Sequence, residues 1–125
     1  MPKLNSPRVG YNSVDVTGNK TLTAADSGIV QDVKANAVIT LPATAAGLRF
    51  VIHVNQTSAG KKPTVSIAPN SADGVTGNGF TAAVNKAINA TSAEFGDFIE
   101  LSGTGTTGVT GWIVDGSAGT WSRAA

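Results

Sequence analysis

A glycine-rich stretch near the end of the chain has the spacing of a nucleotide-binding loop. Residues 103–108 (GTGTTG) match the pattern G-x-G-x-x-G and follow a strand-like segment. In a dinucleotide-binding fold the last glycine of this pattern opens a helix, whose N-terminus contacts the pyrophosphate. Here residues 109–112 lead directly into a second strand-like segment. We therefore predict that residues 103–108 form the loop of a β-hairpin and bind no nucleotide.

The titratable residues do not have the spacing of a catalytic site. His53 is the only histidine and cysteine is absent, so no second His or Cys is present to share a metal ion. Glu94, Asp97 and Glu100 are conceivable carboxylates for glycoside hydrolysis, but Asp97 and Glu100 are three positions apart on one strand and so point to opposite faces. Asp73 lies in a Gly/Asn-rich loop, where a single carboxylate is too few for calcium. We predict no enzyme, no catalytic residue, no cofactor and no metal.

The charge balance argues against several classes of partner. The formal net charge is +1 and the longest basic run is Lys61-Lys62, whereas nucleic-acid binding needs clustered Lys and Arg. No apolar run approaches the length of a membrane span, and the first residues lack the apolar core of a signal peptide. We therefore expect no nucleic acid, no membrane and no small-molecule substrate, and synthesis in a cytoplasm.

Charged residues are scarce, and their place is taken by Thr, Ser, Asn, Ala and Gly. They make up 14% of the sequence, against roughly 25% in ordinary globular domains. A surface of small neutral groups is cheap to desolvate, because no ion has to lose its water. This composition favours a chain whose surface packs against neighbours. It is also compatible with a soluble β domain that has a Thr- and Asn-rich exterior.

Short strand-like segments separated by turn residues predict an all-β fold, a sandwich or a barrel. Residues 48–54 have the clearest period of two, which places His53 on the polar face with Arg49 and Asn55. The other predicted strands are residues 14–17, 21–23, 29–33, 38–41, 64–68, 95–101 and 112–115. Residues 18–19 and 24–28 are predicted turns, and residues 70–79 a loop. Residues 82–88 fit either a turn of helix or a strand that ends near Ile88.

The two ends of the chain differ from the strand-rich middle. Pro2 and Pro7 favour an extended arm over residues 1–13, although a frayed tail fits the same residues, and residues 14–125 form a single β domain. At the other end, Trp121 and Arg123 follow the last predicted strand. A Trp beside an Arg is a candidate interface anchor. The Trp121 side chain fits equally well as a cap over one end of the β fold.

Two groups of segments resemble one family of phage proteins. The first contains residues 21–28 (TLTAADSG), 38–42 (VITLP) and 45–50 (AAGLRF), and the second contains residues 96–101 (GDFIEL), 111–114 (GWIV) and 116–121 (GSAGTW). Together they resemble the head decoration, or capsid cement, proteins of tailed phages over roughly residues 21–121. Similar strings occur in phage tail fibres and other virion proteins.

This resemblance implies a compact antiparallel β-sandwich or barrel of the β-tulip type, assembled as a homotrimer on the exterior of the capsid. Such a protein is made in the host cytoplasm and binds the major capsid protein. We expect the extended arm to dock on the shell, and the candidate contact residues are Leu4, Asn5, Pro7, Arg8, Val9 and Tyr11. The alternative is a tail-fibre or receptor-binding module that binds a glycan through Tyr11, Trp121 and the loop 70–78.

Overall fold

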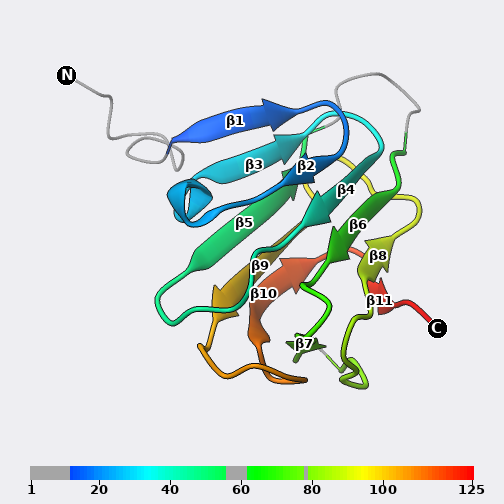
Figure 1. The fold of residues 1–125 in the computed structure, drawn as a ribbon. Helices are drawn as coiled ribbons and strands as arrows, with labels where there is room; N and C mark the ends of the chain where they lie inside the picture. Colours follow the sequence, from blue (N-terminus) through cyan, green and yellow to red (C-terminus); the bar gives the residue numbers. More distant parts are fainter. Residues whose placement is uncertain (1–11, 56–61, 78) are drawn as a thin grey trace.

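The computed structural model describes residues 12–55, 62–77 and 79–125, and these residues form two β-sheets (Figure 1). The predicted all-β fold class is confirmed. The arm residues Leu4, Asn5, Pro7, Arg8, Val9 and Tyr11 lie outside the described residues, and the first strand begins at Ser13. Within the described part, no helix is long and apolar enough to cross a membrane.

The strands divide into a six-stranded and a five-stranded sheet. In spatial order the six-stranded sheet contains β1 (Ser13–Val16), β3 (Val30–Val33), β5 (Arg49–Val54), β9 (Phe98–Gly103), β10 (Trp112–Ala118) and β7 (Val75–Thr76). The five-stranded sheet contains β11 (Ser122–Arg123), β8 (Ile88–Ala90), β6 (Val65–Ala68), β4 (Ala37–Thr40) and β2 (Lys20–Thr21). A short 3₁₀ turn, η1 (Ala24–Asp26), joins β2 to β3, as the turn prediction for residues 24–28 expects.

The first six strands alternate between the two sheets, and within each sheet they pair in parallel. In the six-stranded sheet β1, β3 and β5 run in the same direction, and in the five-stranded sheet β2, β4 and β6 do so too. The predicted antiparallel pairing is therefore wrong for this half. Residues 18–19 do not close a hairpin, because the chain crosses there from one sheet to the other. Each strand of this half therefore pairs with the strand two positions later in the sequence, and the two strands run in the same direction.

The remaining strands pair mainly antiparallel. β9 pairs with β5 on one side and with β10 on the other, and β8 lies between β6 and β11. The predicted closing hairpin is confirmed as β9 and β10, with a bulge between Val114 and Gly116. The structure corrects two other segments. The predicted loop 70–79 contains the short strand β7, which is parallel to β10, and the strand near Ile88 begins at that residue rather than ending there.

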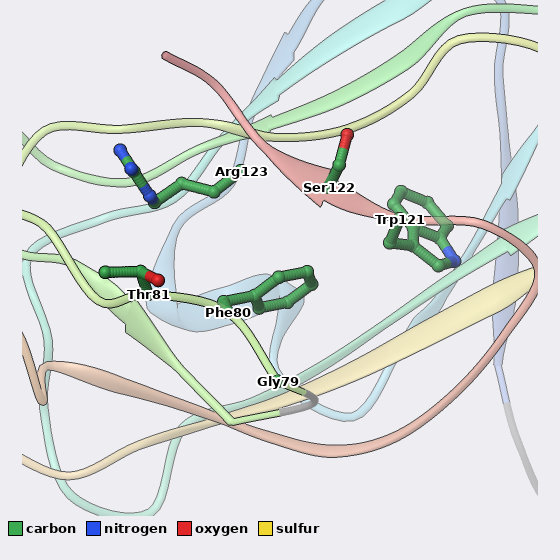
Figure 2. A pocket seen from close by; sticks show the side chains of 6 residues that line it. All are labelled: Gly79, Phe80, Thr81, Trp121, Ser122 and Arg123. Atoms are coloured by element: carbon green, nitrogen blue, oxygen red, sulfur yellow. The ribbon is translucent and has the colours of Figure 1, made fainter.

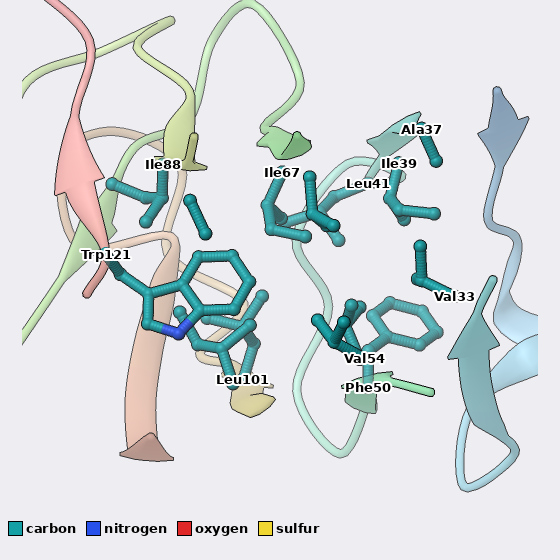
Figure 3. Packing of buried hydrophobic residues seen from close by; sticks show 14 of the residues in the cluster. Val33, Ala37, Ile39, Leu41, Phe50, Val54, Ile67, Ile88, Leu101 and Trp121 are labelled. Atoms are coloured by element: carbon teal, nitrogen blue, oxygen red, sulfur yellow. The ribbon is translucent and has the colours of Figure 1, made fainter. Parts of the chain in front are cut away.

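One apolar core is shared by the two sheets (Figure 3). Phe50, Ile52 and Val54 alternate with partly exposed residues along β5, and each is fully buried. Ile39, Ile67 and Ile88 form a matching row across the five-stranded sheet, through the register of β4, β6 and β8. Full burial of such a side chain stabilises the fold by about 1.5–3 kcal/mol. The strand period thus sets which residues face inward, and it leaves the intervening residues on two outer faces.

Candidate interaction surfaces

The outer face of the five-stranded sheet carries no charged side chain among the described residues. Along the strands, its residues alternate with buried ones. Strand pairing aligns these outward residues in two rows across the sheet. We call this surface the uncharged face; it consists of Thr21, Val38, Thr40, Ser66, Ala68, Asn89 and Ser122. Val38 is 39% exposed, and the Ser66 hydroxyl donates a hydrogen bond to Asn89 Oδ1 over 2.6 Å.

The outer face of the six-stranded sheet is charged. The register places Asp15, Asp32 and His53 in one row across β1, β3 and β5, and Glu100 and Arg49 follow in the next two rows on the same face. We call these five residues the charged face. The Arg49 guanidinium lies 3.1 Å from the Glu100 carboxylate, and Asp15 lies 3.9 Å from the Lys34 ammonium. Most of these charges are therefore neutralised by partners within the chain.

His53 lies on the polar face of β5, as predicted, with its side chain 28% exposed. Its Nδ1 atom is 3.5 Å from the carboxylate of Asp32, a residue that is only 5% exposed. This arrangement holds two members of a hydrolytic triad. A complete triad would add a nucleophilic hydroxyl group that is hydrogen-bonded to the histidine.

The loop with the nucleotide-binding pattern is held by a buried carboxylate. Asp73 is 1% exposed, and its oxygens accept hydrogen bonds from the backbone N–H groups of Thr44 (2.9 Å) and Gly108 (3.3 Å). A Cβ atom at Gly103 would lie 2.4 Å from the Ala45 carbonyl oxygen, so this glycine permits a close backbone approach. The loop leads into β10 and not into a helix, which confirms the hairpin prediction.

The carboxylate of Asp73 is committed to backbone amides rather than arranged around an ion. In the ranges that the structure describes, no group of three or more His, Cys, Asp or Glu side chains could hold a metal ion. The signal that the sequence offered for Asp73 was its Gly/Asn-rich surroundings. The backbone partners of its carboxylate, Thr44 and Gly108, lie in two other loops, so the local sequence did not indicate this contact.

The two predicted anchor residues, Trp121 and Arg123, line one shallow groove (Figure 2). The groove has a volume of about 340 Å³, and its other lining residues are Gly79, Phe80, Thr81 and Ser122. Trp121 is 7% exposed, belongs to the apolar core, and donates its indole N–H to the Ala118 carbonyl oxygen over 2.9 Å. The structure thus places the Trp121 ring mainly in the core, with Phe80 packed against that core beside it.

No family model matches the chain, and no curated protein matches its sequence.

Proposed function

We propose that this protein is a structural component of a phage virion, which decorates the exterior of the capsid as a homotrimer and binds the major capsid protein. The proposal starts from the sequence resemblance over roughly residues 21–121. The observation that carries it in the structure is the uncharged face. A cement protein acts by adding contact area across the seams of a shell, so it needs a broad surface that loses water at little cost.

The uncharged face meets that requirement in its chemistry. Its side chains are small, and a neutral hydroxyl or amide costs far less to remove from water than an ion does. Ser66 and Asn89 already hydrogen-bond to each other, which lowers the cost of covering them. Val38 adds exposed apolar surface in the same row. Contact through this face requires no new ion pair with the partner.

A trimer would multiply a modest affinity at each copy. When one copy has bound, the others act at a high effective concentration, so avidity can exceed the affinity of a single site by a factor of about 10²–10⁴. An extended arm, as proposed for residues 1–13, would add further contacts to a neighbouring subunit.

The proposal is tested by co-sedimentation of the purified protein with capsids that lack it. The substitution Val38→Lys places a charge on the uncharged face, and Val109→Lys is the matched control, because the two valines are 39% and 42% exposed. We expect Val38→Lys to weaken binding about tenfold or more, which corresponds to about 1.4 kcal/mol per site or more. Val109→Lys should bind as the wild type does.

The outcomes separate the parts of the proposal. If the wild-type protein does not sediment with capsids, the assignment as a decoration protein is wrong. If both valine variants bind normally, the protein attaches through another surface. Deletion of residues 1–10 tests the arm without removing Asn12, whose carbonyl oxygen accepts a hydrogen bond from the Val30 N–H. Sedimentation equilibrium gives the oligomeric state, and any state other than a trimer contradicts that part.

A further inference from the structure

Two cationic side chains at one corner of the fold are paired with main-chain oxygens and not with an Asp or Glu side chain of the described residues. Arg123 donates to the carbonyl oxygen of Ala124 (2.8 Å), and Lys86 donates to an oxygen of Ala125 (2.8 Å). The other described lysines and arginines each lie within 3.1–3.9 Å of a carboxylate, in the pairs Lys20–Asp26, Lys34–Asp15, Arg49–Glu100 and Lys62–Glu94. Within the described ranges Arg123 is therefore the cation that has only a neutral carbonyl oxygen as its partner.

Strand pairing brings the two cations to the same place. Arg123 is paired with Ile88 across β11 and β8, and the Ala124 N–H donates to the carbonyl oxygen of Ala87. Lys86 directly precedes this paired segment. Arg123 thus lies on the edge strand β11 and lines the groove, whereas Lys86 precedes the neighbouring strand β8 and lies outside the lining. An anion that entered the groove would meet the positive charge of the Arg123 guanidinium.

The groove combines a charged, an apolar and a hydroxyl-bearing side chain. In Figure 2 the Arg123 side chain extends along one side of it, and Phe80 and Thr81 lie on the opposite side. A guanidinium group binds a carboxylate through two parallel hydrogen bonds. The Phe80 ring provides an apolar surface, and the exposed Thr81 residue provides a hydroxyl group that both donates and accepts. These three groups match a ligand with a carboxylate, an apolar face and hydroxyl groups.

We propose that the groove binds a sugar acid, a hexuronate-like unit of an acidic glycan. Arg123 pairs with the carboxylate, the C–H face of the sugar ring lies on Phe80, and Thr81 hydrogen-bonds to a ring hydroxyl. The volume of about 340 Å³ is at the lower end of the 300–1,000 Å³ range of small-molecule sites, which leaves room for a ring beyond its carboxylate. The groove is lined by residues 79–81 and 121–123, and of the uncharged face it shares only Ser122. Sugar binding is therefore independent of the proposed capsid contact.

Nuclear magnetic resonance of the full-length ¹⁵N-labelled protein tests the proposal, with sodium glucuronate as the ligand. The two indole N–H signals act as an internal comparison, since Trp121 lines the groove and Trp112 is fully buried in the core. Glucuronate should shift the Trp121 signal and leave the Trp112 signal in place. A single shallow site of this kind should saturate at a dissociation constant of about 1–10 mM.

Glucose and acetate are the matched ligands, because each has one half of the chemistry of glucuronate. Both should bind at least about tenfold more weakly than glucuronate does, since either the ion pair or the ring contact is missing. Arg123→Gln should weaken glucuronate binding by a similar factor. Arg49→Gln, which removes an exposed arginine on the charged face, should leave glucuronate binding unchanged.

Three results would overturn the proposal. The first is the absence of a glucuronate-dependent shift in the wild-type protein. The second is an equal response to acetate, which would indicate a simple carboxylate site of the kind that an acidic side chain of a partner protein fills. The third is normal binding to the Arg123→Gln variant. None of these results bears on capsid co-sedimentation, so the two proposals fail separately.

Discussion

The two outer faces of this protein are built on the same strand pattern and carry opposite chemistry. The charged face combines Asp15, Asp32, Arg49, His53 and Glu100, and its Asp15–Lys34 and Arg49–Glu100 ion pairs form within the chain. The uncharged face has only small neutral side chains and Val38 at the equivalent outward positions. Since both sheets bury the same core, the core does not require this difference. It indicates which face is suited to remain in water and which is suited to be covered.

The largest effect on stability is expected at Asp32, the most deeply buried residue of the charged face. Replacement of Asp32, which is 5% exposed, by Ala removes the carboxylate beside His53 and should lower the free energy of unfolding by about 2–3 kcal/mol. Asp15→Ala is the control in the same register row, because its side chain is 68% exposed and should contribute less than about 0.5 kcal/mol. Urea denaturation measures both values. An equal loss of unfolding free energy in the two variants would show that burial does not determine how much each aspartate contributes to stability.

A smaller effect is expected on the uncharged face. The hydrogen bond from Ser66 to Asn89 joins β6 to β8 through two half-buried neutral side chains. A double-mutant cycle with Ser66→Ala and Asn89→Ala should give a coupling of about 1 kcal/mol. The coupling should be the same at low and high salt, since neither group is charged. A clear loss of coupling in about 0.5 M salt, where the Debye length is only about 4 Å, would contradict this description.

The smallest effect is expected for the exposed ion pair of the charged face. Arg49 and Glu100 have side chains that are 56% and 30% exposed, so solvent screens their attraction. The double-mutant cycle with Arg49→Gln and Glu100→Gln should give a coupling of about 0.3–0.5 kcal/mol at low salt and close to zero at high salt. Together, the two cycles compare the faces directly. A coupling larger than that of Ser66 and Asn89 would reverse the ranking of the two faces.

The strands of this fold could be predicted, but the partners of the early strands could not. In β5 the alternation of Phe50, Ile52 and Val54 shows which side of the strand faces the core. The same alternation says nothing about the neighbour to which the backbone hydrogen-bonds. Because the turn at residues 18–19 crosses between sheets, β1 pairs in parallel with β3, and a sequence read strand by strand suggests a hairpin instead.

The groove could be predicted only in part. Trp121 and Arg123 stand out in the sequence as an aromatic residue and a cation after the last predicted strand. Their relation to Phe80 depends on the return of β11 to the edge of the five-stranded sheet, and this is a long-range contact. The burial of Asp32 left no signal either, since a polar residue within a strand indicates an outward direction but not what covers it.

The alternation of strands between sheets also bears on how the chain folds. Among the described strands, β9 and β10 are the only neighbours in sequence that hydrogen-bond to each other. Each of the other pairings has to close a longer loop, as from Ser13 to Val30 or from Ile39 to Ile67. Chains dominated by such distant pairings fold slowly, because loop-closure entropy is lost before the contacts form. The β9–β10 hairpin is therefore the natural nucleus, and the parallel strands of the N-terminal half are expected to join it late.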